Sequence, residues 1–398
     1  MKRIGVLSLV FDNYGTRLQS YALFKILKGI VEDDEIEFIN VENTWNPRND
    51  RLVYIKLLLK KTKAYGIIGL YKCFELLRWL VESKLLRKQV DLQKLNAQRH
   101  ALFNHIISLI PYTEKFYTCQ NIRNGELSHY DAVIVGSDQV WNSEKVGNQD
   151  VFMLDFVGDF KRLTYAASFG ITHIPSAMQN DFKRRMEKFS SLLVREKEAA
   201  ELCHKLGRYD AQVVLDPTLL LYSKDYDKDF SNSEIHISGD YVLVYSLNYS
   251  YKIYDEAYRF CQENHCKMVV LKRSICPPKK LIDSEEIFAA SPEAFLNLIK
   301  NAKVVITNSY HALLFSIIYK SSFFLYLDDA DEENSRLLTV ANMFNLEQHV
   351  FWESGSLPSK LIEINYDRVY EILKKERKRS IELLSGAVKN IKRSVEDA

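Results

Sequence analysis

The chain has 398 residues, a hydrophobic fraction of 47% and 54 basic against 52 acidic side chains, which leaves a formal net charge of +2. One hydrophobic core rarely holds so many residues, so we expect two domains. The balanced charge excludes a global field that attracts nucleic acid, and any charged partner must bind a local patch. The 6 cysteines show no repeated CxxC spacing, which predicts packing thiols in a reducing compartment and no zinc site.

Apolar runs of strand length alternate with longer helical patterns, and this alternation predicts parallel sheets. We expect strands at residues 4–10, 132–135, 163–167, 192–194, 213–215, 241–247, 268–271, 304–306 and 323–327. A polar segment at 222–229 has no apolar period, so it separates an N-terminal α/β domain, 1–225, from a C-terminal α/β domain, 238–355. Residues 366–398 carry a helical period and predict one or two long helices that pack back on the first domain.

The N-terminal domain contains a basic helical insertion around residues 51–119. Between residues 51 and 90, lysine and arginine far outnumber Glu75 and Glu82 and are interleaved with apolar side chains. Lys72 and Glu75 interrupt the apolar stretch, which excludes a membrane span. Two interpretations stay open: a solvated helical insertion packed on the core, or an interfacial helix that contacts the membrane surface or a lipid-linked substrate.

A histidine follows one of the predicted strands. The run 304–306 reads as a buried strand, residues 307–310 as a turn, and the residues after His311 as an apolar helix. In open α/β sheets such strand-to-helix corners bind ligands, and the amides of the helix start attract anions. His311 can therefore meet an anion and move a proton, although a histidine that only caps the helix or packs its ring fits the segment equally well.

Two further corners have the same pattern. After the strand at 132–135, Gly136 permits a tight turn and Ser137 or Asp138 a helix cap. Here Asp138, Gln139 and Asn142 can bind sugar hydroxyls over an apolar platform formed by Trp141, or the segment is a capped turn with a buried tryptophan. The first strand is followed by Asn13 and Gln19 in a segment that opens a helix. Neither GxGxxG nor GxxxxGK[ST] is present, so no dinucleotide site or P-loop is expected.

Three basic residues lie at comparable places. Arg195 follows the strand at 192–194, Lys272 follows the strand at 268–271, and Arg336 lies near the start of a predicted helix, where its charge opposes the helix dipole. Taken alone, Arg195 and Arg336 each fit a surface salt bridge better than an anion-binding role, and Lys272 is a third cationic corner without a strong motif.

Several of these motifs, in this order, resemble the polysaccharide pyruvyl transferase family over roughly residues 1–348. The shared motifs are Asn13-Tyr14-Gly15 with Leu18-Gln19, Gly136-Ser137-Asp138-Gln139-Val140-Trp141-Asn142, Tyr165-Ala166-Ala167-Ser168-Phe169-Gly170, Val194-Arg195-Glu196, Asp216-Pro217-Thr218, Thr307 to Ser316, and Ser335-Arg336. The resemblance implies two doubly wound, Rossmann-like domains that face a central cleft, as in GT-B glycosyltransferases. It also implies that pyruvate from phosphoenolpyruvate is placed as a ketal on a sugar of a bacterial cell-surface glycan, such as an exopolysaccharide or capsule, or on its lipid-linked precursor.

The resemblance further implies the roles of individual residues and the setting of the reaction. His311 is expected to be catalytic, and no cofactor or metal is expected beside the phosphoenolpyruvate donor. The enzyme is expected in the cytoplasm, with peripheral contact through 51–90 to the inner face of the membrane. Donor binding is expected from Arg195, Arg336, Ser309, Tyr310 and Lys272, and acceptor binding from Asn13, Gln19, Asp138, Gln139 and Trp141.

One position departs from the family pattern, because Ser309 lies where some family motifs carry an arginine two residues before the histidine. Arg336 or Lys272 is expected to replace that donor-binding charge. Two other functions are compatible with the same corners: a GT-B glycosyltransferase that uses a nucleotide sugar, and a non-catalytic relative that binds glycans.

Overall fold

The computed structural model describes residues 2–31, 34–42, 92–142, 149–155, 161–174, 176–247, 251–272, 283–329 and 334–396. The chain divides into two compact units. Unit 1 comprises Met1–Pro47, His105–Leu221 and Tyr370–Ala398, and unit 2 comprises Arg48–Asn104 and Tyr222–Val369. The first domain was predicted to end at residue 225, and the corresponding part of unit 1 ends at Leu221. The basic stretch at 51–90 lies outside the described residues.

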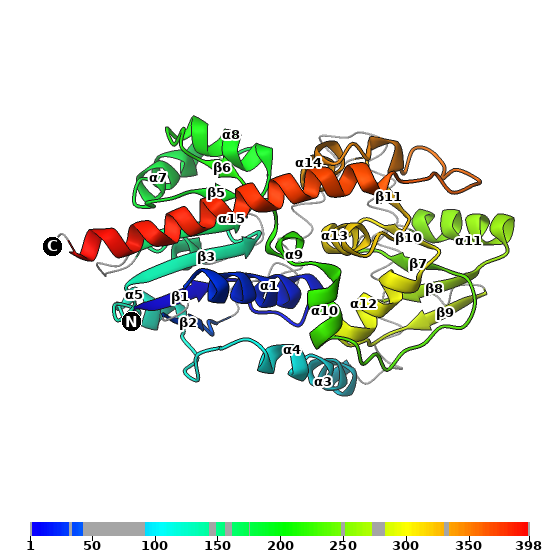
Figure 1. Ribbon diagram of the computed structural model, residues 1–398, viewed down its shortest axis with the longest axis horizontal. Helices are drawn as coiled ribbons and strands as arrows, with labels where there is room; N and C mark the ends of the chain where they lie inside the picture. Colours follow the sequence, from blue (N-terminus) through cyan, green and yellow to red (C-terminus); the bar gives the residue numbers. More distant parts are fainter. Residues whose placement is uncertain are drawn as a thin grey trace. The chain divides into compact units, whose positions relative to one another are not determined.

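Unit 1 is built on a six-stranded parallel sheet with the order β2-β1-β3-β4-β5-β6 (Figure 1). Its strands are β1 (Arg3–Leu7), β2 (Glu35–Phe38), β3 (Ala132–Asp138), β4 (Lys161–Ala167), β5 (Leu193–Val194) and β6 (Gln212–Val213). Its helices are α1 (Tyr14–Ile30), α4 (Asn104–Ser108), α5 (Cys119–Arg123), α6 (Gln149–Phe152), α7 (Ser176–Met186), α8 (Lys197–Lys205) and α9 (Pro217–Leu220).

Unit 2 has a second six-stranded parallel sheet, with the order β12-β11-β10-β7-β8-β9. Its strands are β7 (Tyr241–Tyr245), β8 (Lys267–Leu271), β9 (Ser284–Ile287), β10 (Val304–Thr307), β11 (Phe323–Leu327) and β12 (Val350–Trp352). Its helices are α3 (Leu92–Leu102), α10 (Ser223–Asp229), α11 (Lys252–Asn264), α12 (Pro292–Asn301), α13 (Tyr310–Tyr319), α14 (Asn334–Met343) and the 3₁₀ turn η1 (Glu347–His349). The two sheets confirm the predicted pair of Rossmann-like domains, whereas the cleft stays a prediction.

The final helix belongs to both units. A single helix, α15 (Tyr366–Glu396), occupies the C-terminal segment for which one or two helices were predicted. In unit 1, Arg377 donates to the carbonyl oxygens of Leu219 and Leu221, and Ser380 accepts from the amide of Leu215. These bonds satisfy main-chain groups near the end of the unit 1 sheet, which confirms that the segment packs back on the first domain.

Strand β3 is longer than its apolar run. It continues through Gly136 and Ser137 to Asp138, so the predicted turn at Gly136 and the helix cap at the next two residues are wrong. A Cβ atom on Gly136 would lie 3.0 Å from the Leu23 side chain of α1. Glycine therefore suits the close approach of the helix to the strand, and the chain does not turn there.

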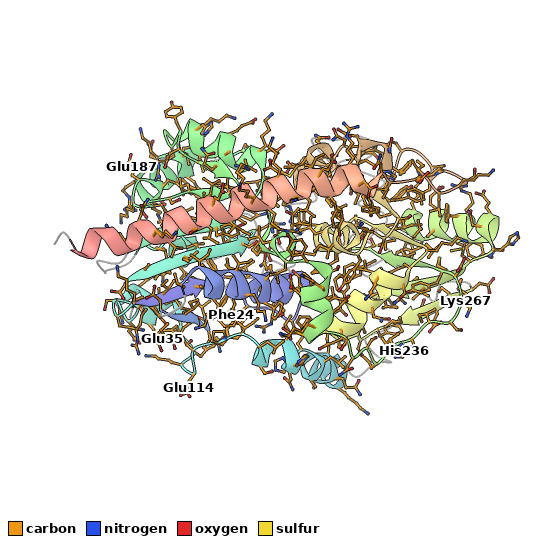
Figure 2. The ribbon with its side chains drawn as sticks, in the orientation of Figure 1. Phe24, Glu35, Glu114, Glu187, His236 and Lys267 are labelled. Atoms are coloured by element: carbon orange, nitrogen blue, oxygen red, sulfur yellow. The ribbon has the colours of Figure 1, made fainter. Side chains whose placement is uncertain are left out.

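Apolar side chains fill the space between sheet and helices in each unit (Figure 2). Phe24 of α1, labelled in Figure 2, meets Phe38 of β2 edge to face at a centroid distance of 6.4 Å. Cys203 and Cys261 are buried free thiols, and burial raises the pKa of each to about 12, so both stay protonated at neutral pH. Among the described residues, no helix has both the length and the apolar character needed to cross a bilayer.

Candidate functional site

Each sheet has one place where neighbouring strands send their following segments to opposite sides. In unit 1 this switch point lies between β1 and β3, and in unit 2 between β7 and β10. Ligands of open α/β sheets bind beyond the carboxyl ends of the strands at such points. Asn13 follows β1, Asp138 is the last residue of β3 and His311 follows β10, so the topology places them where a ligand site is expected.

The corner that carries His311 is fixed by side chains in unit 2. Thr307 donates to the carbonyl oxygen of Tyr245 at 2.5 Å and accepts from the amide of Ser309 at 3.0 Å. Ser309 is buried and caps α13, with its hydroxyl 3.4 Å from the amide of Ala312. His311 follows in the first turn of α13 and is half-buried, which confirms its predicted place at a strand-to-helix corner.

Two of the predicted donor residues lie beside the histidine. The rings of Tyr310 and His311 are perpendicular, with centroids 5.3 Å apart. Arg336, in the first turn of α14, lies with its guanidinium carbon 5.7 Å from the centroid of the Tyr310 ring. The fold therefore brings together an imidazole, an aromatic ring and a guanidinium from segments separated by 25 residues in the sequence.

Lys272 has a different environment from the one predicted. Its side chain is 2% exposed, its ammonium group lies 2.7 Å from a carboxylate oxygen of Glu286, and it also lies over the ring of Phe288. A buried ammonium that already faces a carboxylate contributes little positive charge to a donor. The structure therefore does not support the assignment of Lys272 to donor binding, because Glu286 on β9 neutralises it.

Asp138 forms the polar edge of unit 1 at the carboxyl end of β3. Its side chain is 16% exposed and accepts from the hydroxyl of Thr16 and from the amide of Gln139. Its backbone has φ +90°, a value that costs a non-glycine residue free energy and is retained mostly at functional sites. Gln19 is buried and donates to the carbonyl oxygen of Ser137. It therefore holds the backbone next to Asp138 and does not face solvent.

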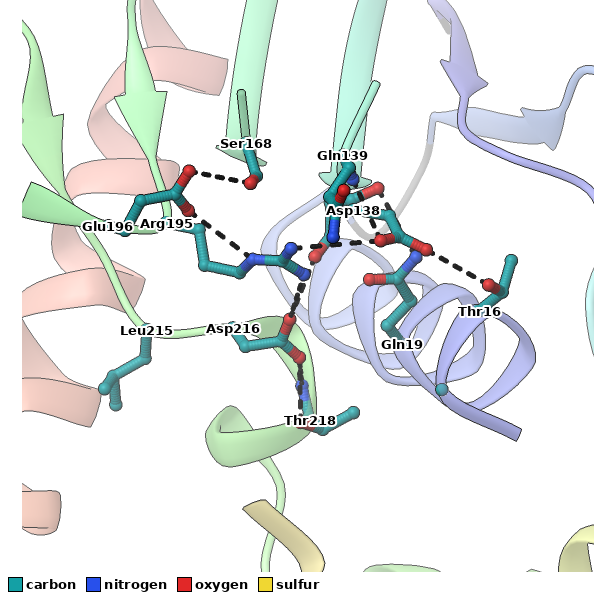
Figure 3. A network of polar contacts seen from close by, with 12 residues as sticks. Thr16, Gln19, Asp138, Gln139, Ser168, Arg195, Glu196, Leu215, Asp216 and Thr218 are labelled. Carbon is teal, nitrogen blue, oxygen red and sulfur yellow. Dashed lines mark hydrogen bonds and ion pairs between the residues drawn. The ribbon is translucent and has the colours of Figure 1, made fainter. Parts of the chain in front are cut away.

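Arg195 lies in a network of carboxylates and is fully buried (Figure 3). Its guanidinium nitrogens lie 3.3 Å from Asp216, 3.7 Å from Glu196 and 3.8 Å from Asp138. Glu196 also accepts from the Ser168 hydroxyl at 2.7 Å. The predicted contact of Arg195 with the donor is therefore not supported, because the side chain faces three carboxylates inside unit 1.

Two other residues assigned to acceptor binding also have structural roles. Trp141 is fully buried against Phe169 and donates its indole N–H to the carbonyl oxygen of Phe152, so the predicted sugar platform is wrong and the alternative of a buried tryptophan is right. Gln139 is buried and accepts from the side chain of Asn142.

Asn13 and Gly170 likewise hold the backbone near the same edge. Asn13 caps α1 by accepting from the amides of Gly15 and Thr16. Gly170 has φ +59°, and a Cβ there would lie 2.6 Å from the Gln139 amide oxygen, so only glycine fits.

Sequence reasoning missed three residues that shape these edges. Thr16 binds Asp138, Asp216 binds Arg195, and Asn308 binds the segment after β7. Asp216 could have been found from the tripeptide Asp-Pro-Thr, which is a helix-cap pattern. In the structure Asp216 caps α9. Within the described ranges, no group of three or more His, Cys, Asp or Glu side chains is arranged to hold a metal ion.

Comparison with known proteins adds two findings. A family model described as polysaccharide pyruvyl transferase matches residues 13–326. No curated protein matches the chain.

Several solved structures resemble the chain. UDP-N-acetylglucosamine 2-epimerase from Rickettsia bellii matches 100% of both chains at 10% identity with a TM-score of 0.50. UDP-GlcNAc 2-epimerase from Neisseria meningitidis bound to UDP-GlcNAc matches 100% of both chains at 8% identity and a TM-score of 0.49. UGT89C1 from Arabidopsis thaliana matches at 9% identity and a TM-score of 0.42, over 99% of this chain and 98% of the other. At such identities the first match bears on the fold alone, and it agrees with a GT-B-like pair of Rossmann-like domains.

If Arg195 stabilises the fold by pairing with buried carboxylates, replacing it must destabilise the protein. We expect Arg195→Leu to lower the free energy of unfolding by about 3–5 kcal/mol, because it leaves buried carboxylates without their cation. Urea denaturation of the two proteins measures this difference. Arg184→Leu is the matched control, since Arg184 is 54% exposed and solvent screens its ion pairs. A fully stable Arg195→Leu variant with weakened donor affinity would instead restore the predicted ligand role.

Proposed function

Because the chain belongs to the polysaccharide pyruvyl transferase family, we propose that it transfers pyruvate from phosphoenolpyruvate, as a ketal, onto two hydroxyls of a sugar in a bacterial cell-surface glycan or its lipid-linked precursor. The observation that carries this proposal is the position of His311. It lies in the first turn of α13, at the switch point of the unit 2 sheet, and the ring of Tyr310 contacts both its imidazole and the guanidinium of Arg336.

The donor carries a carboxylate and a phosphate, so its site needs positive charge and amide donors. Arg336 supplies a planar guanidinium that binds either group through paired hydrogen bonds, and the first turn of α13 adds the positive end of a helix dipole. Lys272 is neutralised by Glu286, so we assign to Arg336 the charge that Ser309 does not provide. Ser309 acts instead through its cap, which orders the turn before His311.

The chemistry requires proton transfer and no redox step. The methylene carbon of phosphoenolpyruvate takes one proton and becomes a methyl group, while the adjacent carbon forms one bond to each of two sugar oxygens and loses its bond to phosphate. The two sugar hydroxyls release two protons. One returns to the acid that protonated the methylene carbon, and the other leaves with the phosphate. A bound phosphate dianion favours the protonated imidazole, so donor binding prepares His311 as the acid. We propose no separate cofactor.

The acceptor side of the proposal rests on Asp138. A partly exposed carboxylate on a strained backbone, held by Thr16, is suited to accept hydrogen bonds from sugar hydroxyls. Asn13, Gln19 and Gln139 hold the surrounding backbone in place. We propose that these residues shape the acceptor site and that Asp138 contacts the sugar.

Replacing the proposed acid tests the reaction. We expect His311→Gln to lower kcat for phosphate release from phosphoenolpyruvate, with a nitrophenyl galactoside or lipid-linked acceptor, by at least about 100-fold, because general acid catalysis supplies about 10²–10⁴. His236→Gln is the control, since His236 is exposed in the loop before β7.

Release of a nucleotide from a nucleotide sugar, without phosphate release from phosphoenolpyruvate, would identify a glycosyltransferase. Acceptor binding without turnover of either donor would identify a glycan-binding relative.

Removing the proposed donor charge tests the role of Arg336. We expect Arg336→Ala to raise KM for phosphoenolpyruvate about 10- to 100-fold, because a hydrogen bond to a charged group contributes about 1.5–3 kcal/mol. Arg336→Lys should fall between wild type and Arg336→Ala, since lysine keeps the charge but lacks the planar pair of donors. Steady-state kinetics measure KM, with Arg368→Ala, an exposed arginine on α15, as control. Unchanged KM in Arg336→Ala would remove Arg336 from the donor site.

We also propose that the enzyme acts in the cytoplasm, at the inner face of the membrane, through the basic stretch at 51–90. Each lysine near an anionic surface contributes about 1 kcal/mol to binding. We therefore expect the full chain to float with anionic vesicles and a variant with glutamine at Lys56, Lys60, Lys61 and Lys63 to float much less. Neutral phosphatidylcholine vesicles are the control. Equal flotation of both proteins with anionic vesicles would refute the membrane contact.

A further inference from the structure

Side chains continue the pairing of β7 and β10 beyond the last paired residues of the two strands. The register pairs Thr307 with Tyr245, and no further pair follows it in the described ladder. Next in the chain, Asn308 uses both ends of its side-chain amide. Its oxygen accepts from the amide of Leu247 at 2.7 Å, and its nitrogen donates to the hydroxyl of Ser246 at 3.1 Å. We call these two bonds the Asn308 clamp.

The topology explains why a clamp is useful at this point. The segment after β7 leads through α11 to β8, on one side, and the segment after β10 leads through α13 to β11, on the other. Neighbouring segments that depart in opposite directions leave a crevice open between them. Two side-chain hydrogen bonds between these departing segments come from Asn308.

The clamp is not needed to hold the sheet together. Four consecutive residue pairs already join β10 to β7, and the residues of both strands are buried. Asn308 itself is half-buried, where a hydrogen bond contributes only about 1 kcal/mol to stability. What the clamp does fix is the direction in which the backbone leaves β10, three residues before His311.

We infer that Asn308 is a positioning residue for His311, an inference that rests on the proposed function. By tying the corner to Ser246 and Leu247, the Asn308 clamp sets where the first turn of α13 begins and therefore where the imidazole points. A catalytic acid must be held within about 0.5 Å of its working position. The residue that places the acid is thus separate from the residues that bind the donor.

Substitutions at Asn308 separate positioning from stability. Asn308→Ala removes both bonds, whereas Asn308→Asp keeps an oxygen for the Leu247 amide and accepts a hydrogen bond from the Ser246 hydroxyl, which can reverse its role. Asn301→Ala is the matched control, because Asn301 is exposed on α12 and bonds only to its own helix. Should Asn308→Ala fail to fold in a thermal melt, Ser246→Ala removes one bond of the clamp and takes its place.

Two measurements on the full chain decide the inference. We expect kcat and kcat/KM for phosphoenolpyruvate to fall together, by about 100-fold, in Asn308→Ala and to stay unchanged in Asn301→Ala. In Asn308→Asp we expect kcat to recover largely while KM stays raised, because the added carboxylate repels the doubly anionic donor. In protein labelled with [¹³Cε1]histidine, we expect the His311 ring signal, identified by its loss in His311→Gln, to shift in Asn308→Ala alone.

Unchanged kinetics and an unmoved ring signal in Asn308→Ala would overturn the role of Asn308, and so would an equal loss in Asn301→Ala. If wild-type protein releases no phosphate from phosphoenolpyruvate, the proposed function fails by itself. The ring signal then decides alone whether the Asn308 clamp orients His311, because it is read without turnover.

Discussion

Parallel pairing is the constraint on which the rest of this structure depends, since it brings the carboxyl end of every strand to the same edge of its sheet. In both units, strand order reverses between two central strands, and the polar residues that follow those strands meet at that edge. Asp138 and Thr16 meet in unit 1 although 122 residues separate them, and Asn308 meets Ser246 in unit 2 although 62 residues separate them. Pairing of apolar strands thus assembles polar sites that no local segment contains.

The same constraint decides which strands could be predicted. Interior strands of a parallel sheet are buried on both faces and read as continuous apolar runs, as the five buried residues of β7 do. The three strands that the sequence did not reveal, β2, β9 and β12, are all sheet edges. β2 and β9 each carry two glutamates and are partly exposed, and β12 has only three residues, none of them buried. An edge strand needs few apolar side chains, so its sequence carries little signal.

The candidate site shows a second limit of the sequence. That Arg195 and Lys272 follow strands could be predicted from the apolar runs before them, but their burial could not. Each is neutralised by a carboxylate, Asp216 or Glu286, which reaches it from a neighbouring part of the sheet edge. The apolar pattern of a sequence predicts which residue follows a strand, but the carboxylate that pairs with that residue is known only from the tertiary structure. A basic residue at the end of a strand is therefore a weak indicator of a ligand site. The place of His311 at a strand-to-helix corner was predicted correctly because its turn and helix are local features.

Neutralisation also explains why the two edges suit different substrates under the proposed function. In unit 1, Arg195 faces three carboxylates, and Asp138, one of the three, is partly exposed and can accept hydrogen bonds from sugar hydroxyls. In unit 2, Lys272 is neutralised by Glu286, and His311, Asn308 and Arg336 are half-buried. A doubly anionic donor is attracted by the second set and repelled by the first. Under the proposed function, we therefore expect the donor at the histidine corner and an uncharged sugar at the edge that carries Asp138.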